Sequence, residues 1–386
     1  MYNIILVRYG EIILKGNNRS YFERKLISNI KDALKDEEIK IHYSQARIFV
    51  EPKDATKINR IIKKIIKVFG IVSVSPAVKI ATDLSLIKST AIKLMEEKMV
   101  GKTFKVEARR GDKSFPLTSP EIAREIGGEI LENVPGLKVD VNNPDNELNI
   151  EVREETYIYL EKIEALGGMP TGTNGRGLLL VSGGIDSPVA GFMLARRGVE
   201  VDAIHFFSPP YTGPKAKEKV IDLCKIVAGY SGKINLYMIN FTDAQLSIRD
   251  NCPKEQMVLL MRRIMMRIAE IVAKEKGCDA LITGENIGQV ASQTMASMVT
   301  TNEVVNIPVF RPLIGMDKND IIDMAKKIGT YETSILPYED CCTIFVPKHP
   351  ETNPKVEKIR ESEKHLNLEK IIDDAIKNME HIVIGE

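Results

Sequence analysis

A glycine-rich turn at residues 182–187, Ser-Gly-Gly-Ile-Asp-Ser, carries residue types that bind phosphate. It follows the aliphatic run 178–181, which reads as a strand, and we expect a helix to begin near Ser187 and Pro188. Proline favours the first turn of a helix, and a serine hydroxyl can cap its N-terminus. The turn would therefore aim backbone N–H groups and the positive end of a helix at one anion. Its two glycines would let that anion approach the backbone closely.

This turn differs from a Walker loop, in which a Lys beside the last Ser or Thr reaches the β- and γ-phosphates. Here the Lys is absent and Asp186 stands in the turn, where an acid is useful if it helps to hold Mg²⁺. The order Ser-Gly-Gly-x-Asp-Ser after an aliphatic strand resembles the PP-loop of the N-type ATP pyrophosphatases. That resemblance implies ATP cleavage between the α- and β-phosphates and adenylation of a substrate. An ordinary glycine turn is the alternative, and the strand, turn, acid and helix start together argue against it. The expected phosphate-binding residues are Ser182, Gly183, Gly184 and Ser187.

Three further segments would reach the same site in an α/β sheet, because ligands of such sheets bind at the carboxyl ends of the strands. His205 and Phe206 end the next predicted strand, where a ring can contact adenine. Arg262 lies on a long predicted helix, and taken alone it is equally well interpreted as a surface charge. Gly284 and Gln293 lie in a turn after another aliphatic strand, and a purely structural turn would be preferred if this segment stood alone.

Two adjacent cysteines, Cys341 and Cys342, follow an acidic dipeptide in the predicted loop 337–350. A thiolate is the nucleophile in sulfur chemistry and needs exposure and nearby positive charge, which Lys348 and His349 could supply. Burial as small apolar side chains is the alternative for this pair. That alternative fits the other cysteines, which fall in predicted helices or at apolar positions: Cys224, Cys252 and Cys278.

The strands and helices that must position these residues divide the chain into three predicted domains of an α/β protein. Residues 1–75 read as β-α-β-β-α-β, the order of a ferredoxin-like fold. Residues 76–172 read as a second small α/β domain. Residues 173–386 contain short aliphatic strands separated by helices, which is typical of a doubly wound parallel sheet. From about Pro347 the tail is charged, with one predicted helix at 368–379.

Composition is that of a globular protein, with 44% hydrophobic and 28% charged residues, so extensive disorder is not expected. No apolar run approaches the roughly 18 residues of a membrane span, and the N-terminus lacks a signal-peptide pattern. With five cysteines and no export signal, we expect the reducing cytoplasm rather than a disulfide framework. Residues 1–70 contain 15 Lys and Arg against 8 Asp and Glu. This surplus fits a polyanionic partner and, equally well, solvated helix faces.

Several motifs in a fixed order resemble the tRNA 4-thiouridine synthetases, which are tRNA sulfurtransferases of the ThiI type. They are RYGEIILKGNNRSYFE, EARRGDKSFPLTSPEI, SGGIDSPVA, ITGENIGQVASQT, RPLIGMDKNDII and PYEDCCTIF. The resemblance implies an N-terminal ferredoxin-like domain, a THUMP domain and a PP-loop ATP pyrophosphatase domain. It implies Asp186 as the acid required for adenylation and Cys341 as the cysteine that carries persulfide sulfur. It implies ATP binding at Leu180, Val181, His205, Phe206, Arg262, Gly284 and Gln293.

The reaction implied by the resemblance forms 4-thiouridine at position 8 of tRNA, with ATP and Mg²⁺ as cofactors. ATP would adenylate the uridine C4 oxygen, and a persulfide on Cys341, loaded by a cysteine desulfurase, would deliver sulfur to C4. The family is also implicated in passing sulfur to the thiamine sulfur carrier protein, and it suggests a homodimer. The N-terminal and THUMP domains would bind tRNA. Our expected contacts to RNA phosphates are Arg109, Arg110 and Lys113.

Two features of some family members are not expected in this chain. Longer members carry a C-terminal rhodanese-like domain, which we do not expect in a chain ending at Glu386. Some relatives are thought to hold an iron–sulfur cluster, which takes three or four Cys ligands. Without a C-x-x-C pair we predict no cluster and no protein-bound metal.

Two rival functions remain. One rival is a PP-loop enzyme that adenylates a small-molecule or protein carboxylate, against which the basic N-terminal segment argues. The other is a tRNA chaperone with an inactive nucleotide site, against which intact Asp186 and Cys341 argue.

Overall fold

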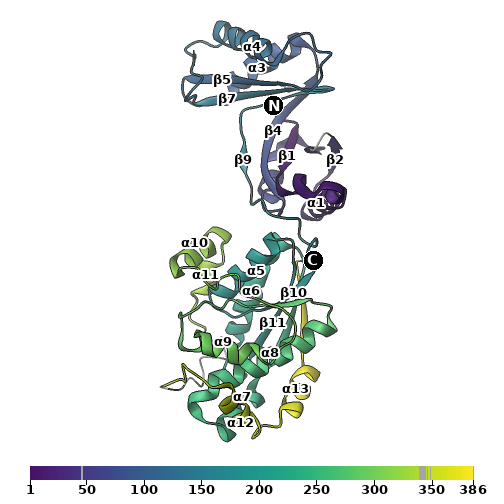
Figure 1. Ribbon diagram of the computed structural model, residues 1–386. Coiled ribbons are helices and arrows are strands. Elements are labelled where there is room, and N and C mark those ends of the chain that lie inside the picture. Colours follow the sequence, from purple (N-terminus) through teal and green to yellow (C-terminus); the bar gives the residue numbers. More distant parts are fainter. Residues whose placement is uncertain (45–46, 339–344, 346, 348, 386) are drawn as a thin grey trace. The chain divides into compact units, whose positions relative to one another are not determined.

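The structure, a computed structural model, describes residues 1–44, 47–338, 345, 347 and 349–385. Its contacts divide the chain into two compact units, Met1–Gly168 and Met169–Glu386 (Figure 1). Each unit has its own sheet and its own hydrophobic core.

The first unit contains, in chain order and with η marking a 3-10 helix, β1 (Ile4–Tyr9), η1 (Glu11–Asn18), α1 (Arg19–Ala33), β2 (Ile39–Ser44), β3 (Arg47–Pro52), η2 (Ala55–Lys57), α2 (Ile58–Ile65), β4 (Ile71–Ala81), α3 (Leu84–Lys98), β5 (Thr103–Arg110), α4 (Ser119–Asn133), β6 (Lys138–Val139), β7 (Asn146–Val152), β8 (Glu155–Tyr159) and β9 (Ile163–Glu164). Among the described residues its strands form one sheet of nine, in the order β2-β3-β1-β4-β8-β7-β5-β6 with β9 on β4. The long strand β4 pairs first with β1 and then with β8, and the expected division at residue 75 falls inside it.

The described α-helices of this unit pack on one face of the sheet. Val74 of β4 joins a hydrophobic cluster with α1 and α2, and Val78 joins one with α3 and α4. Both side chains lie on the same face because successive side chains of a strand alternate. The opposite face carries a smaller buried cluster: Ile4, Leu6, Phe49, Ala77, Tyr157 and Tyr159.

The second unit contains, in chain order, β10 (Arg176–Leu180), α5 (Asp186–Arg196), β11 (Glu200–Phe207), α6 (Pro214–Ser231), β12 (Ile234–Asn240), α7 (Thr242–Asn251), η3 (Lys254–Gln256), α8 (Met257–Glu275), β13 (Ala280–Ile282), η4 (Ala291–Gln293), α9 (Met295–Asn302), β14 (Val309–Phe310), α10 (Lys318–Ile328), α11 (Tyr331–Ser334), α12 (Val356–Glu363), α13 (Leu368–Lys377) and β15 (Glu380–Ile384). The described strands form a sheet in the order β14-β13-β10-β11-β12-β15, with helices on both faces (Figure 1). All neighbouring pairs are parallel except β12 and β15. The expected doubly wound parallel sheet is therefore confirmed, and the carboxyl ends of its parallel strands lie at one edge.

Two elements of the charged tail are absent from the prediction. Strand β15 is antiparallel and lies at the edge of the sheet, so its stability depends on pairing with β12 rather than on a long apolar run. Helix α12 buries a single apolar side chain, Ile359, together with Ser362 and Glu363. An apolar stripe is the sequence signal of a helix, and α12 has almost none.

Candidate functional site

The loop between β10 and α5 is closed by its two serines. Ser187 Oγ accepts a hydrogen bond from the N–H of Ser182 at 2.9 Å, and Ser182 Oγ accepts one from the N–H of Gly184 at 3.3 Å. Helix α5 begins at Asp186, preceded by Ile185 without a side-chain cap. The expectation that Ser187 caps this helix is wrong, because its hydroxyl bonds back to the loop. The loop still leads into a helix N-terminus, as anion binding requires.

Asp186, in the first turn of α5, is held by two side chains from distant segments. Nζ of Lys318, the first residue of α10, lies 2.7 Å from Oδ1, and Nε2 of Gln289 donates to Oδ2 at 2.8 Å. Lys318 lies 132 residues after Asp186, so no local spacing in the sequence marks the pair. The expected site residue Gln293 does not make this contact; its Oε1 accepts the N–H of Asn286 at 3.3 Å. Lys318 thus places beside the loop a cation that the loop itself lacks.

Gly284 follows β13 and lies directly against this loop. A Cβ at Gly284 would be 2.8 Å from the backbone N of Ser187 and 2.9 Å from the carbonyl carbon of Asp186. Both atoms belong to the backbone, which cannot rotate away as a side chain can. The close approach of two backbones therefore requires glycine here.

The buried carboxylate of Glu285 holds two arginines at the carboxyl ends of β13 and β14. It forms ion pairs with Arg262 of α8 and with Arg311, whose Nε lies 2.7 Å from Oε2. It also accepts the Thr283 hydroxyl at 2.8 Å. Burial would raise the pKa of the Glu285 carboxyl, but the charges of Arg262 and Arg311 hold this pKa below its ordinary value. Arg262 is thus fixed beside the site rather than solvated, and Arg311 is a neighbour that the sequence did not reveal.

The rings of His205 and Phe206, near the end of β11, are buried. His205 is 4% exposed, and its Nδ1 lies 2.8 Å from the carbonyl oxygen of Val181. The Phe206 ring is 5% exposed and packs edge-to-face on Phe241 in the core. Leu180 is partly buried against the same core. The Phe206 ring is therefore not free to contact adenine.

Described residues on either side of the predicted sulfur-bearing cysteine contact the loop and the segment of Gln293. Upstream, the Ser334 hydroxyl donates to the carbonyl oxygen of Gly184 at 3.4 Å. Downstream, the Thr294 hydroxyl donates to the carbonyl oxygen of Thr352 at 2.7 Å. The residues between these attachments that lie outside the described part of the chain are 339–344, 346 and 348, which include Cys341, Cys342 and Lys348.

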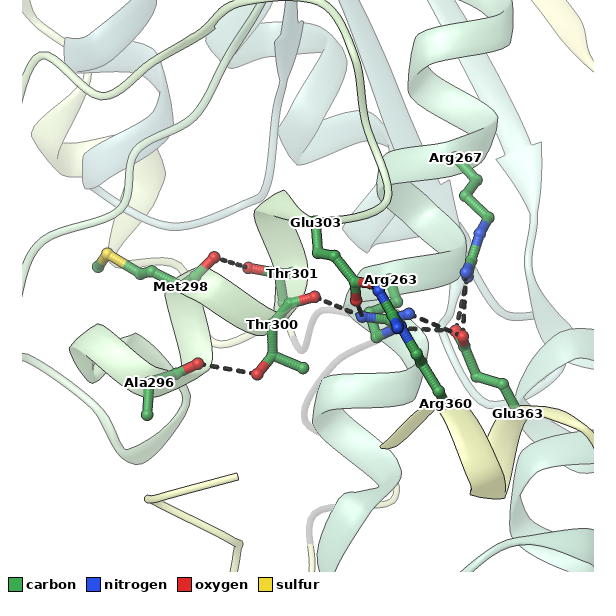
Figure 2. A network of polar contacts seen from close by, with 9 residues as sticks. All are labelled: Arg263, Arg267, Ala296, Met298, Thr300, Thr301, Glu303, Arg360 and Glu363. Carbon is green, nitrogen blue, oxygen red and sulfur yellow. Dashed lines mark hydrogen bonds and ion pairs between the residues drawn. The ribbon is translucent and has the colours of Figure 1, made fainter. Parts of the chain in front are cut away.

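A buried ion-pair network holds α12, which follows this segment, against α8 and α9 (Figure 2). Arg263 of α8 is 1% exposed; its Nη2 lies 2.8 Å from Glu363, and its Nη1 lies 2.7 Å from Glu303. Arg267 and Arg360 pair with the same two carboxylates. Burial would raise the pKa of Glu363, but hydrogen bonds from Arg263 and Arg267 hold this pKa below its ordinary value. The network connects the end of the cysteine segment to the helix that also carries a site arginine.

The expected RNA contacts lie at the end of β5 in the first unit and in the turn after it. Arg109 and Lys113 are exposed. Arg110 is half-buried: its Nη1 donates to the carbonyl oxygen of Phe115 at 3.2 Å, and its backbone N–H donates to Ser119 Oγ at 2.9 Å. Two of the three side chains are thus accessible, and the third shapes the turn.

Burial raises the pKa of Cys224 and Cys278 to about 12, so these thiols stay protonated and are poor nucleophiles. Cys252 is half-buried, and burial raises its pKa as well. Within the described part of the chain, no group of three or more His, Cys, Asp or Glu is placed to hold a metal ion. None of the described helices is both long enough and apolar enough to span a membrane.

Comparisons with known proteins match this chain to described families along most of its length. The chain matches the family described as thiamine biosynthesis protein (ThiI) over residues 172–368, the ThiI ferredoxin-like domain over 4–75 and the THUMP domain over 81–161. A protein of Acetivibrio thermocellus is 58% identical, over 100% of this chain and 99% of its own. One of Alkaliphilus metalliredigens is 53% identical, over 98% of both chains. Both are named probable tRNA sulfurtransferase.

A solved structure supports the same family. The crystal structure of a 4-thiouridine synthetase–RNA complex with bound ATP matches with a TM-score of 0.92 and 38% identity, over 100% of both chains. The expected family, enzyme class and fold are confirmed. With the ferredoxin-like, THUMP and ThiI matches together spanning most of its length, this chain belongs to the ThiI family of tRNA sulfurtransferases.

Proposed function

We propose that this enzyme uses ATP to convert uridine 8 of tRNA to 4-thiouridine. The observation that carries the proposal is that described residues on either side of Cys341, Ser334 and Thr352, contact Gly184 of the loop and Thr294 beside Gln293. The reaction needs a sulfur-bearing thiol and a nucleotide in one cleft. The relatives named as tRNA sulfurtransferases, and the 4-thiouridine synthetase solved with RNA and ATP, support the same assignment.

The first step activates the base, because the amide-like C4 carbonyl of uridine resists attack. Its oxygen attacks the α-phosphorus of ATP, and pyrophosphate leaves. Backbone N–H groups at the start of α5 and the Lys318 ammonium would stabilise the charge on that pyrophosphate. Arg262 and Arg311, held by Glu285, would add positive charge at the same edge of the sheet.

Mg²⁺ fits beside the loop. This ion is usually bound through one or two carboxylates together with substrate phosphates and water, and Asp186 offers one carboxylate. The two oxygens of Asp186 are 2.7 Å from Lys318 and 2.8 Å from Gln289, so the ion would share or replace these contacts. When bound, the ion would offset phosphate charge, while the loop orients the phosphates and Asp186 holds the ion.

The second step replaces oxygen by sulfur. A cysteine desulfurase would load Cys341 with a persulfide, whose terminal sulfur attacks C4 of the adenylated uridine, and AMP leaves with the former C4 oxygen. A thiol reductant then supplies two electrons to break the S–S bond between the base and Cys341, becomes a disulfide and releases 4-thiouridine. The description of the family as thiamine biosynthesis protein supports the thiamine sulfur carrier protein as a second acceptor.

The test is a thiolation assay with unmodified tRNA, ATP, Mg²⁺, cysteine, a cysteine desulfurase and a thiol reductant. Absorbance of 4-thiouridine and release of pyrophosphate are measured separately. We expect Cys341→Ser to abolish thiolation while adenylation continues, and Asp186→Ala to stop both. The adjacent Cys342→Ser is the matched control and should retain thiolation. Adenylation of a carboxylate in place of tRNA would support the rival enzyme, and tRNA binding without pyrophosphate release would support a chaperone.

A further inference from the structure

A buried lysine of α6 contacts the part of the chain that leads to Cys341. Lys219 is 6% exposed, although lysine side chains are almost never fully buried unless they are paired. Its Nζ donates a hydrogen bond to the carbonyl oxygen of Leu336 at 2.8 Å. Leu336 follows α11, and α6 packs directly against that helix. The ammonium therefore joins α6 to a described residue upstream of the predicted sulfur-bearing cysteine.

The carbonyl group of Leu336 does not need this lysine to be hydrogen-bonded. Its oxygen also accepts the backbone N–H of Tyr338 at 2.8 Å. Burying an ammonium is costly, and replacing a buried ionic group by an apolar side chain of similar volume is often neutral or stabilising. Stability alone would therefore favour an apolar side chain such as methionine at position 219. The lysine points to a purpose other than stability.

Burial of apolar side chains does not fix the stretch of chain after α11. Ile335 and Leu336 are 50% and 42% exposed, so neither side chain anchors this stretch in a hydrophobic core. Polar groups join it to its surroundings instead. The Ser334 hydroxyl donates to the carbonyl oxygen of Gly184, and the Lys219 ammonium donates to Leu336. Removing the ammonium would therefore let Leu336 move while α6 and α11 stay packed together.

The start of α6 and the loop before it contact described residues on both sides of Cys341. Upstream, Nζ of Lys215, in the first turn of α6, lies 5.7 Å from the centre of the Tyr338 ring. Downstream, the Phe345 ring packs edge-to-face on the ring of Tyr211, with 5.2 Å between the ring centres. Tyr211 lies in the loop before α6. One short part of the chain thus supports the approach to the cysteine and the exit from it.

We propose that Lys219 is a positioning residue for sulfur transfer, which fixes Leu336 so that the sulfur carried by Cys341 meets C4 of the adenylated uridine. The inference rests on the proposed function and adds a residue to its second step. Lys219 takes no part in making or breaking bonds. The contacts described above that close the phosphate loop and hold Asp186 do not involve Lys219, so adenylation should proceed without it. Sulfur transfer should be sensitive to it, because a misplacement of about 1 Å can slow a reaction on the order of 100-fold.

The test measures the two steps separately in Lys219→Met. Methionine is similar in length and uncharged, so it fills the buried space without donating to Leu336. We expect tRNA-dependent pyrophosphate release within about twofold of wild type, and single-turnover formation of 4-thiouridine roughly 10- to 100-fold slower. The KM values for ATP and tRNA should not change. Lys225→Met is the matched control: Lys225 lies on the same helix, exposed and paired with Asp222, and its loss should leave both steps at wild-type rates.

Two further measurements separate a positioning role from a structural one. A positioning residue predicts that the melting temperature of Lys219→Met equals or exceeds that of wild type, whereas a lower melting temperature with both steps slowed would overturn the inference. Native Lys219→Met should be cut by chymotrypsin after Leu336 or Tyr338 faster than wild type is. An unchanged rate of cutting would show that Lys219 does not fix this stretch, and would also overturn the inference.

Two controls identify what has failed. Sulfur loaded onto Cys341 from radiolabelled cysteine and a cysteine desulfurase should reach the wild-type level in Lys219→Met; a lower level would place the defect in loading and overturn the inference. Thiolation by the wild-type protein is measured on the same tRNA. If the wild type forms no 4-thiouridine, the proposed function fails. If it does and Lys219→Met thiolates as fast as Lys225→Met, this inference alone fails.

Discussion

The substitution Gly284→Ala tests whether the close approach of β13 to the phosphate loop matters. The new Cβ would lie 2.8 Å from the N of Ser187, 2.9 Å from the carbonyl carbon of Asp186 and 3.0 Å from the Cα of Ser187, whereas ordinary contact begins at 3.4 Å. Moving from 2.8 to 3.4 Å requires a displacement of about 0.6 Å of the first turn of α5 or of the turn after β13. Overpacking of this kind costs about 1–3 kcal/mol of stability.

The same displacement moves Asp186 relative to the loop that orients the phosphates. A misplacement of about 1 Å can reduce catalysis on the order of 100-fold, so we expect kcat/KM for ATP to fall by roughly 10-fold or more. The assay is tRNA-dependent pyrophosphate release, with urea unfolding to measure stability. Gly315→Ala is the matched control, because no heavy atom lies within 4 Å of its added Cβ. Wild-type pyrophosphate release and stability for Gly284→Ala would refute the argument that this contact sets the loop.

Three further outcomes follow from the described residues. Glu363→Gln should lower the free energy of unfolding at pH 7 by about 3–5 kcal/mol, because it leaves Arg263 buried without its main partner. The pKa of Glu363 is lowered from 4.5 in the folded protein, so its contribution is present above about pH 4.5 and lost as the pH falls; urea unfolding should show wild type and variant converging in acid, and a constant difference would contradict this. Gly229→Ala, inside α6 with open space around its Cβ, should raise the free energy of unfolding by about 0.5–1 kcal/mol, and a loss of stability would count against the open environment. Iodoacetamide at pH 8 should spare Cys224 and Cys278 in the native protein and modify them after denaturation, as read by mass spectrometry; rapid native labelling would be inconsistent with their burial.

The sequence predicts the fold well where apolar residues repeat with a clear period. The aliphatic strands β10, β11 and β13 and the ferredoxin-like order of the first unit appear as expected. The tail is predicted less well, since α12 is held by ion pairs through Glu363 rather than by an apolar stripe. Strand β15 is a short edge strand whose partner is more than a hundred residues away. Neither feature leaves a local pattern that a reader of the sequence can detect.

The candidate site is also only partly predictable from the sequence. The glycine-rich loop and Asp186 are continuous in the sequence, so their types and spacing suffice to predict a phosphate site. Lys318 and Gln289 reach Asp186 only because the strand ends that precede their segments lie at one edge of the sheet. Glu285 is likewise recognisable only when the structure brings its two arginines together. An ion pair that forms only through tertiary contacts leaves no motif in the sequence.

The shared strand β4 has a practical consequence for dividing this protein. Its first part completes one half of the sheet through β1, and its last part completes the other half through β8. A cut at either end would leave one half with an unpaired edge, and exposed strand edges promote aggregation. The ferredoxin-like and THUMP parts should therefore be expressed, or exchanged between proteins, as one fragment that ends near Gly168.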